Sequence, residues 1–237
     1  MTYLTTIFII GLLILVHEWG HLLAARWARI PVARFSIGFG PVLWFWHKGG
    51  VEYCVSLVPL GGYVMPRFES EEEFLRIAPG RRIVMWLGGP AANLVLAGLG
   101  LMVCAAAAGR WSPRALLVDP WIQVAAGAVH IAMVLPSIFL HPEGLSGIIG
   151  IVAAGKSFVA TGVVSSLRFG VLLSLNLAVF NLLPLPPLDG GKIICCLLEK
   201  INRRLASLHT RFAVVGIALL LTLMAYTTVM DVVRQLA

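Results

Sequence analysis

Long apolar stretches, each about the length of a membrane-spanning helix, dominate the hydropathy pattern of this chain. A helix needs about 20 mostly apolar residues to cross the hydrocarbon core of a bilayer. Four stretches reach that length, over residues 3–28, 83–108, 163–183 and 212–233. The pattern therefore predicts a mostly α-helical integral membrane protein, with about four transmembrane helices in a single domain over residues 1–237.

A fifth apolar stretch, residues 121–140, is interrupted by polar residues and by a proline. It can span the bilayer, or it can lie in the interface as an amphipathic helix. Of the 18 Lys and Arg residues, eight lie within 26–82 and five within 192–211. Basic loops stay on the cytoplasmic side, and these two share a side only if an even number of spans separates them. We therefore expect 121–140 to be an interfacial helix.

Residues 34–66 show the alternation of apolar and small or polar side chains that is typical of β-strands. His47-Lys48-Gly49-Gly50 supplies a turn signal in the middle. The pattern predicts a β-hairpin, and the aromatic run at 44–46 suits a bilayer interface. Ser70, followed by Glu73, then predicts the capped start of a short surface helix.

Composition supports the membrane assignment. Hydrophobic residues make up 59% and charged residues 12%, against about 25% charged in a typical globular protein. These values exclude a disordered chain, a coiled coil and a soluble nucleic-acid-binding module. The net charge of +7 is explained by the two basic loops, so we expect no nucleic-acid partner.

The first apolar stretch contains His17-Glu18-Trp19-Gly20-His21, an HExxH motif. On a helix, positions i and i+4 share one face, so His17 and His21 can bind one metal ion with Glu18 beside it as a base. Ionisable residues are rare within spanning helices and need a reason. A bound metal supplies one, and the alternative is a His–Glu cluster that joins helices without metal.

A catalytic zinc usually takes three protein ligands, and Asp189 is the candidate for the third. It follows three prolines, at 184, 186 and 187, which break a helix. Irregular backbone at membrane depth is tolerated only where it lines a cavity, so Asn176 and Asn181 are expected to face the same cavity. The alternative role for Asp189 is that of an N-cap for a helix over 191–201.

The chain resembles the site-2 protease family of intramembrane zinc metalloproteases, most closely the bacterial branch that cleaves membrane-bound anti-sigma factors and signal-peptide remnants. The matching motifs run nearly end to end: HEWGH at 17–21, RFSIGFG at 34–40, PLGGY at 59–63, GPAAN at 89–93, LSG at 145–147 and NLLPLPPLDGG at 181–191.

The resemblance implies one zinc ion per chain, bound by His17, His21 and Asp189, with Glu18 as the catalytic base. It also implies that Asn176 lies beside the substrate and that the hairpin re-enters the membrane. Two departures stand out. Residues 109–162 are too few for the PDZ domains that bacterial relatives commonly carry, so we expect none. Lys192 stands where related sequences often have His, a change with no evident meaning in the sequence.

These features predict an intramembrane zinc metalloendopeptidase that cleaves transmembrane segments of membrane proteins or signal-peptide remnants. A substrate helix must unwind before attack, and the segment Pro59, Leu60, Gly61 and Gly62 is the candidate edge that would hold the unwound strand. We expect a multi-pass protein of the bacterial inner membrane, with its site toward the cytoplasm. The sequence does not indicate an oligomeric state.

Three alternatives are weaker. A non-proteolytic zinc-binding scaffold descended from the protease should have lost Glu18 or Asp189, and both are retained. A zinc transporter would gain nothing from Glu18. A rhomboid-like serine protease, suggested by GLSG at 144–147, needs a later membrane histidine, and the later candidate His209 lies in a basic loop.

Overall fold

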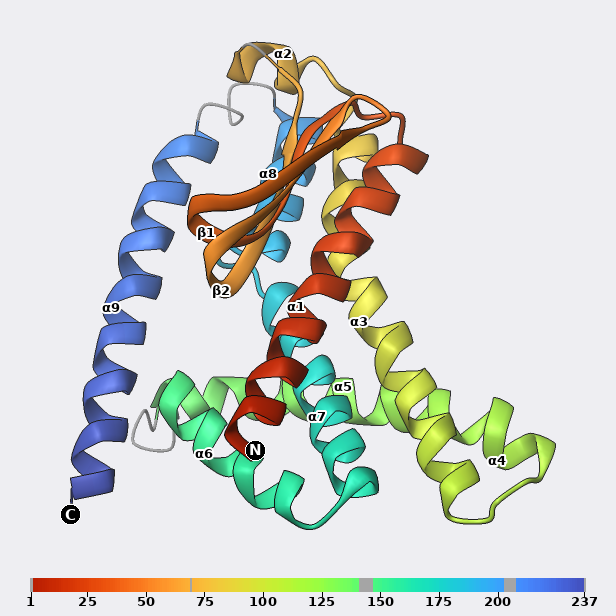
Figure 1. Cartoon of the computed structure of the whole chain (residues 1–237). Coiled ribbons are helices and arrows are strands. Elements are labelled where there is room, and N and C mark those ends of the chain that lie inside the picture. The colour runs from red at the N-terminus through yellow and green to blue at the C-terminus, as the bar shows by residue number, and fades with distance from the viewer. Residues whose placement is uncertain (1, 69, 141–146, 203–207, 237) are drawn as a thin grey trace. The chain divides into compact units, whose positions relative to one another are not determined.

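The computed structural model describes residues 2–68, 70–140, 147–202 and 208–236, and the chain is mostly helical (Figure 1). In order, the elements are α1 (Thr2–Trp27), β1 (Val32–Lys48), β2 (Val51–Pro66), α2 (Glu71–Leu75), α3 (Pro79–Ala107), α4 (Pro113–Leu117), α5 (Asp119–Leu140), α6 (Ile148–Ala160), α7 (Val163–Asn181), α8 (Asp189–Ile201) and α9 (Leu208–Leu236).

The chain folds as two compact units. One, which we call the hairpin unit, comprises Gly11–Asn93 and Phe180–Val215. The other, the helical unit, comprises Met1–Ile10, Leu94–Val179 and Gly216–Ala237. Each unit has a hydrophobic core of its own. The residues predicted to bind metal all belong to the hairpin unit.

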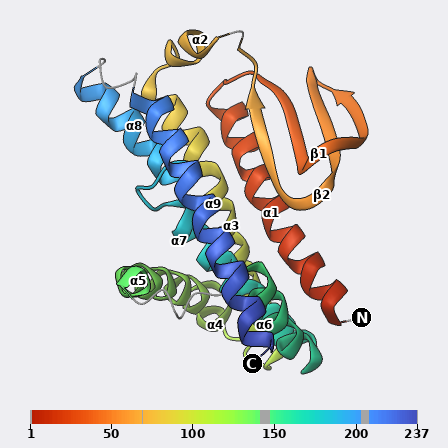
Figure 2. The ribbon, with the colours of Figure 1, turned by 90° about the vertical axis from the view of Figure 1, so that its left-hand side faces the viewer.

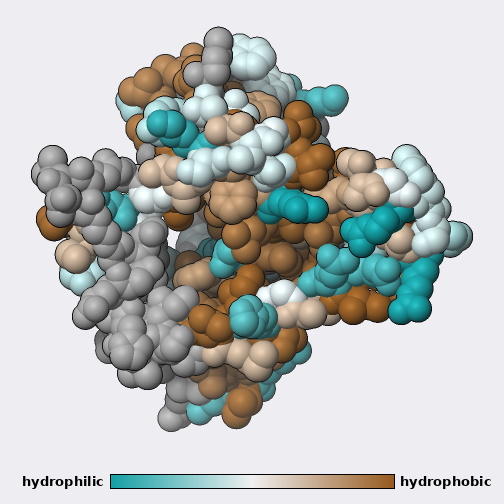
Figure 3. Space-filling model, turned by 90° about the horizontal axis from the view of Figure 1, so that it is seen from below, coloured by the Kyte–Doolittle hydropathy of each residue, from teal (hydrophilic) through white to brown (hydrophobic). Residues whose placement is uncertain are grey.

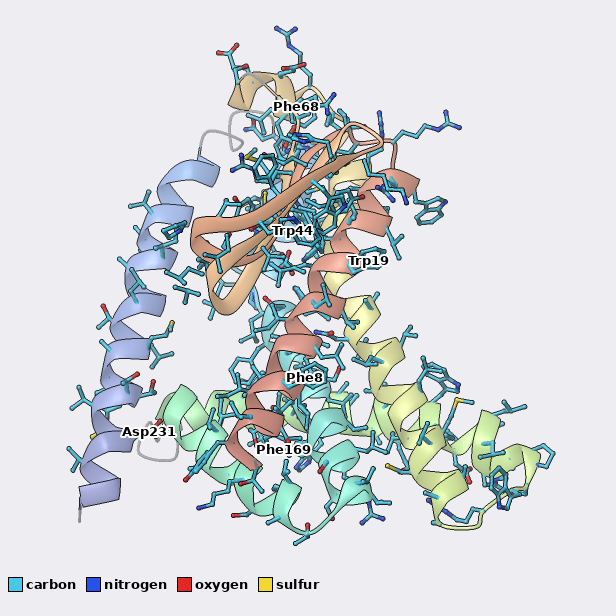
Figure 4. All side chains as sticks on the ribbon, viewed as in Figure 1. Phe8, Trp19, Trp44, Phe68, Phe169 and Asp231 are labelled. Carbon is cyan, nitrogen blue, oxygen red and sulfur yellow. The ribbon has the colours of Figure 1, made fainter. Side chains whose placement is uncertain are left out.

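The predicted hairpin is confirmed. β1 and β2 pair antiparallel around a turn at Gly49 and Gly50, whose φ angles of 60° and 75° suit glycine in a two-residue hairpin turn. Both strands bend, so that Phe35 lies opposite Val64 on one side and Tyr53 on the other. The outer part of β1 is exposed and carries Trp44 (Figure 4).

The core of the hairpin unit lies between the sheet and helix α1. Phe35 and Tyr53 from the sheet are buried together with Leu22 of α1 and Met85 of α3. Figure 2 shows α1 with the sheet on one side and with α3 and α8 on the other. The motif helix is therefore packed on two faces, which fixes its rotation about its own axis.

Helices α1 and α3 touch through two glycines. A Cβ atom on Gly20 would lie 2.3 Å from the carbonyl oxygen of Gly88, and one on Gly88 would lie 2.4 Å from that of Gly20. Small residues at helix crossings let backbones approach closely within membranes. The glycine inside HEWGH therefore has a structural purpose, which is to bring α3 against the two histidines.

Helix α8 is tied to α3 by a buried ion pair between Arg82 and Glu199. Arg82 is 1% exposed, and its Nε also donates to the carbonyl oxygen of Ile77 at 3.1 Å. A buried guanidinium is tolerated only when it is paired and hydrogen-bonded. The pair therefore holds α8, whose first residue is Asp189, in a fixed register along α3.

In the helical unit, Asp231 of α9 is buried and accepts a hydrogen bond of 2.8 Å from the backbone N–H of Gly150 in the first turn of α6 (Figure 4). A carboxylate is stabilised at a helix N-terminus, where backbone N–H groups lack partners and the helix dipole is positive. This contact anchors α9 on α6, a helix that the sequence pattern did not indicate.

The N-cap predicted at Ser70 is confirmed, since its side chain accepts from the backbone N–H of Glu73. Apolar side chains lie on the molecular surface as well as inside (Figure 3). Within the described residues, five helices are long and apolar enough to cross a membrane, over Thr2–Trp27, Pro79–Ala107, Pro113–Leu135, Val163–Asn181 and Val214–Asp231. The expected mostly α-helical, multi-pass membrane protein is thus confirmed.

Four of these helices correspond to the predicted spans. The fifth, Pro113–Leu135, overlaps the stretch 121–140 that we assigned to the interface, and its length and composition alone also suit a span. The interfacial assignment of 121–140 stays a prediction.

Reporters fused at Trp111 and at Gly162 should therefore report the same, extracytoplasmic side. The reason is that an interfacial 121–140 leaves the chain on one side, and α6, with 13 residues, is short of the about 20 that a span requires. A fusion after Lys200 is the control and should report the cytoplasmic side. Reporters at Trp111 and Gly162 on opposite sides would show that 113–135 crosses the membrane.

Candidate metal centre

The two histidines of the HExxH motif lie on one face of α1, as the spacing predicts. His17 and His21 are 6% and 5% exposed, and their Nε2 atoms are 3.1 Å apart. The ring planes are nearly perpendicular, at 85°. Two buried imidazoles whose nitrogens point at one another without a shared ligand would leave polar atoms poorly satisfied, so this arrangement favours a common metal ion.

Asp189 joins the two histidines, although it is 172 residues from His17 in the chain. One of its carboxylate oxygens, Oδ2, lies 3.2 Å from Nε2 of His17 and 3.1 Å from Nε2 of His21. A carboxylate binds a metal in its ionised form, and Oδ2 is the oxygen of Asp189 that faces both histidine nitrogens.

The alternative role for Asp189, that of an N-cap, is not what the structure shows. Helix α8 begins at Asp189 itself, and the N-cap residue is Leu188, without a side-chain cap hydrogen bond. The loop before α8 closes tightly on the helix, because a Cβ on Gly190 would lie 2.2 Å from the carbonyl oxygen of Leu182. The Asp-Gly-Gly sequence thus lets the proline-broken loop fold back and aim Asp189 at α1.

The three donor atoms fit zinc. They are separated by 3.1, 3.1 and 3.2 Å, and ligand atoms on a tetrahedral zinc with bonds of about 2.0–2.1 Å are about 3.3 Å apart. Two imidazole nitrogens and one carboxylate oxygen are also a donor set of catalytic zinc sites, which keep a fourth position open. His17, His21 and Asp189 would hold the ion.

Helix α3 orients both imidazole rings. The carbonyl oxygen of Met85 lies 2.8 Å from Nδ1 of His21, and the backbone N–H of Gly89 lies 3.3 Å from the same atom. The contact with Met85 is the shorter one, and a carbonyl only accepts, so we assign the proton to Nδ1, which leaves the lone pair of Nε2 for the metal. The amide nitrogen Nδ2 of Asn93 lies 3.1 Å from Nδ1 of His17. With the amide turned over, its oxygen would take this place and accept from Nδ1–H in the same way. Such outer partners fix the tautomer and orientation of metal-binding histidines.

Gly89 leaves the room for an ion. It lies between Met85 and Asn93 on the same face of α3, one helical turn from each. A Cβ on Gly89 would lie 2.4 Å from Nε2 of His21 and 2.7 Å from Nε2 of His17. Any side chain at this position would therefore crowd the two nitrogens that are to bind the metal.

Glu18 lies next to the ligand histidines and packs against strand β2. A Cβ on Gly62 would lie 2.7 Å from Cγ of Glu18 and 2.7 Å from the carbonyl oxygen of Ser36. The hairpin therefore confines the Glu18 side chain from one side. Gly62, predicted from the sequence as part of a substrate-binding edge, is placed directly beside the predicted base.

The other predicted substrate-binding residues are less closely tied to the centre. Gly61 lies over the ring of Phe39, while the side chains of Pro59 and Leu60 are outside the described part. Asn181 ends α7 in the hairpin unit. Asn176 belongs to the helical unit, where its amide donates to the carbonyl oxygen of Leu172 at 2.9 Å. Their roles in substrate binding stay predictions.

The remaining motifs and histidines add no ligand among the described residues. His47 is exposed on the hairpin, 4.0 Å from Glu52, and His130 is exposed on α5. His141 and the serine of the rhomboid-like string, Ser146, lie outside the described residues, as does the side chain of His209.

Sequence reasoning missed the supporting residues Met85, Trp86, Gly89 and Asn93 of α3, and it left Lys192 unexplained. The signal that could have found Gly89 and Asn93 is their spacing of four residues, which places a small and a polar position on one helical face. Met85 contacts His21 through its backbone carbonyl, so its side-chain type gives no indication that it orients this histidine.

Comparisons with known proteins agree with this geometry. The model of peptidase family M50 matches residues 5–225. The Campylobacter jejuni protein Cj1068, named as a candidate zinc metalloprotease, is 27% identical over 343 aligned residues, covering 98% of this chain and 93% of that protein. The regulator of sigma-E protease RseP of Escherichia coli is 42% identical over 98 residues, covering 37% of this chain and 22% of its own.

A similarly named Chlamydia trachomatis protein is 41% identical over 105 residues, covering 37% of this chain and 17% of that one. For most of these relatives, the match spans less than a quarter of their own length. The Campylobacter alignment is longer than this chain, so that relative contains residues without a counterpart here. The resemblance to the site-2 protease family is confirmed.

Gly89→Ala should abolish zinc binding, because the added methyl group would lie within contact distance of both ligand nitrogens. Gly80→Ala is the matched control, since Gly80 is on the same helix and has open space around it. Zinc content after purification, measured by atomic absorption, should fall from about one ion per chain to near zero in Gly89→Ala alone. Full zinc in both variants would contradict the assigned position of the ion.

Proposed function

Because the chain belongs to peptidase family M50, we propose that it is a zinc metalloendopeptidase that hydrolyses peptide bonds within transmembrane segments of membrane proteins. The observation that carries this proposal is the convergence of His17, His21 and Asp189 on one point, with Glu18 beside them. Relatives whose names include zinc metalloprotease and RseP support it.

Zinc, when bound, supplies Lewis-acid polarisation of the scissile carbonyl and activation of a water molecule. The protein residues do the rest. Glu18 takes the proton from the attacking water at its carboxylate and passes it to the nitrogen of the leaving amine. Met85 and Asn93 keep both imidazoles oriented, and Gly62 limits the positions that the Glu18 carboxylate can occupy.

The substrate class follows from the chemistry of a spanning helix. Every backbone carbonyl of such a helix is bonded internally, so the helix must unwind before one can be attacked. The β2 segment from Pro59 to Gly62 is the candidate edge for the unwound strand, through main-chain hydrogen bonds. The placement of Gly62 next to Glu18 supports this role, because a strand bound at this end of the segment would run past the base.

The cellular setting is also part of the proposal. The five apolar helices make this a multi-pass membrane protein. Its relatives include bacterial proteins, and because bacterial outer-membrane proteins are β-barrels, a helical protein of this kind belongs in the inner membrane. Arg26 lies in the last turn of α1 and Lys200 in the last turn of α8, the two helices that carry the site. Because basic residues favour the cytoplasmic side, we expect the site to lie toward the cytoplasm. Its partners are then the lipid bilayer and substrates with a membrane span.

The alternative of a non-proteolytic zinc-binding scaffold is not favoured. Binding zinc requires His17, His21 and Asp189 but not Glu18. A half-buried carboxylate without a function is costly in a spanning helix, and Glu18 is retained beside the predicted ligands, where Gly62 confines it.

Zinc binding and catalysis should separate in variants. His17→Ala or Asp189→Ala should lose zinc and activity together, since each removes a ligand. Glu18→Gln should keep zinc and lose at least about 100-fold in kcat, because the base is not a ligand. The measurement is cleavage of a membrane-embedded model peptide by purified protein, alongside zinc content. Chelation should stop the wild-type reaction, and zinc should restore it.

Wild-type rates in Glu18→Gln would refute the assignment of the base. An active wild type that purifies without zinc and resists chelators would refute the metalloprotease proposal as a whole.

Gly62→Ala should lower kcat by about 10–100-fold while leaving zinc content unchanged. The added methyl group displaces Glu18, and a misplacement of about 1 Å can cost about 100-fold in rate. Gly11→Ala is the control and should be neutral, because Gly11 lies in α1, the helix of Glu18, with open space around it. An unaffected rate in Gly62→Ala would show that the hairpin does not position the base.

A further inference from the structure

Lys192 lies beside the metal centre, and the mechanism above does not use it. It is on α8, three residues after Asp189, so both side chains lie on the same face of the helix. Its Nζ is 3.3 Å from Oδ1 of Asp189. The other oxygen, Oδ2, is the one that faces His17 and His21.

The two oxygens of Asp189 are thus divided between different partners. A carboxylate can bind a metal through one oxygen or through both. With Oδ1 held by an ammonium group, Oδ2 alone remains for the metal. Binding through one oxygen leaves the fourth position of a tetrahedral zinc to water and substrate.

Trp86 holds the ammonium group where it is. Nζ of Lys192 lies 4.1 Å from the centroid of the Trp86 ring, a distance typical of a cation–π interaction. The same ring meets the ring of His21 edge-on, at 6.0 Å and 74°. Its Nε1 is buried and without a hydrogen-bond partner among the described residues. The indole therefore contributes through its ring contacts with Lys192 and His21 and not through its N–H.

The helix that carries Lys192 is itself fixed. At its far end Glu199 pairs with Arg82 of α3, while Trp86 of α3 receives Lys192 at its near end. Two contacts with one helix leave α8 little freedom to rotate, and rotation is what would let Oδ1 turn toward the histidines. The Lys192 side chain is 29% exposed, which leaves it partly solvated and tolerant of substitution.

We propose that Lys192 is a positioning residue of the metal centre: its ammonium group, seated on Trp86, holds Oδ1 and restricts Asp189 to single-oxygen coordination through Oδ2. The inference rests on the proposed zinc site. It also gives meaning to a lysine at a position where the sequence alone suggested none.

The test compares Lys192→Met, which removes the charge but keeps the length, with Lys192→Arg, which keeps a cation. Lys200→Met is the matched control, since it makes the same change on an exposed position of the same helix. Each variant is purified, assayed on a membrane-embedded peptide, and loaded with zinc or with cobalt as a spectroscopic probe of coordination number.

Lys192→Met should keep its zinc, because it loses a cation near Zn²⁺ and so loses a repulsion. Its kcat should fall by about 10–100-fold with KM little changed. The visible bands of the cobalt form should weaken, as expected when coordination number rises above four. Lys192→Arg and Lys200→Met should resemble wild type in all three measurements.

Trp86→Leu is a second route to the same result, since it removes the ring and leaves the ammonium in place. It should shift the cobalt spectrum in the same direction as Lys192→Met, whereas Trp86→Phe, which keeps an aromatic face, should not.

Unchanged kcat and an unchanged cobalt spectrum in Lys192→Met would overturn the inference and leave the protease proposal standing. Loss of zinc from Lys192→Met would also overturn it, because Lys192 would then support binding rather than coordination mode. A wild type that binds neither zinc nor cobalt would reject the metal site itself, and the inference with it.

Discussion

The approach of α1 and α3 at Gly20 and Gly88 is the contact on which the rest of the hairpin unit depends. Side chains at either position would push the helices apart, since each Cβ would meet the opposite carbonyl oxygen at 2.3–2.4 Å. Only at this separation do Met85 and Asn93 of α3 reach the Nδ1 atoms of His21 and His17. The predicted ligands come from α1 and α8, but the orientation of the two histidines comes from α3.

Electrostatics in an apolar surrounding adds a second constraint. A buried ionic group is costly unless it is paired or bound to metal, and the hairpin unit concentrates several such groups. Asp189 is met by His17, His21 and Lys192, while Glu199 is met by Arg82. Each carboxylate of α8 therefore has a cationic or metal-binding partner from another part of the chain, and these pairings specify how α8 docks.

The features that the sequence predicted correctly are those that depend on short-range patterns of residues along the chain. The hairpin depends on alternation and a Gly-Gly turn, the cap at Ser70 on spacing, and the histidine pair on the helical repeat. The sequence indicated Asp189 as the candidate third ligand because an acid next to three prolines is unusual in an apolar run, and the structure places it beside both histidines. The face of α3 was not found, because Met85 acts through its carbonyl and Gly89 through the side chain it lacks. Helix α6 was missed because its 13 residues fall below the length of a span.

The same region also shows why local helix propensity is a poor guide here. Gly88 and Gly89 each cost a helix about 1 kcal/mol relative to Ala, and Pro90 deprives the carbonyl of Trp86 of its helical donor. Yet α3 continues through all three, and Pro90 is fully buried. In an apolar setting, an unpaired backbone group is so costly that the chain stays helical. Positions 88–90 therefore do not need to be good helix formers. Gly88 allows the close approach of α1, and Gly89 leaves room for the predicted ion. Trp86, on the turn before them, contacts the ammonium group of Lys192. Residues 88–90 thus lower the intrinsic stability of the helix, and the same residues provide the space that the metal centre requires. Departures from local sequence rules of this kind are expected at functional sites.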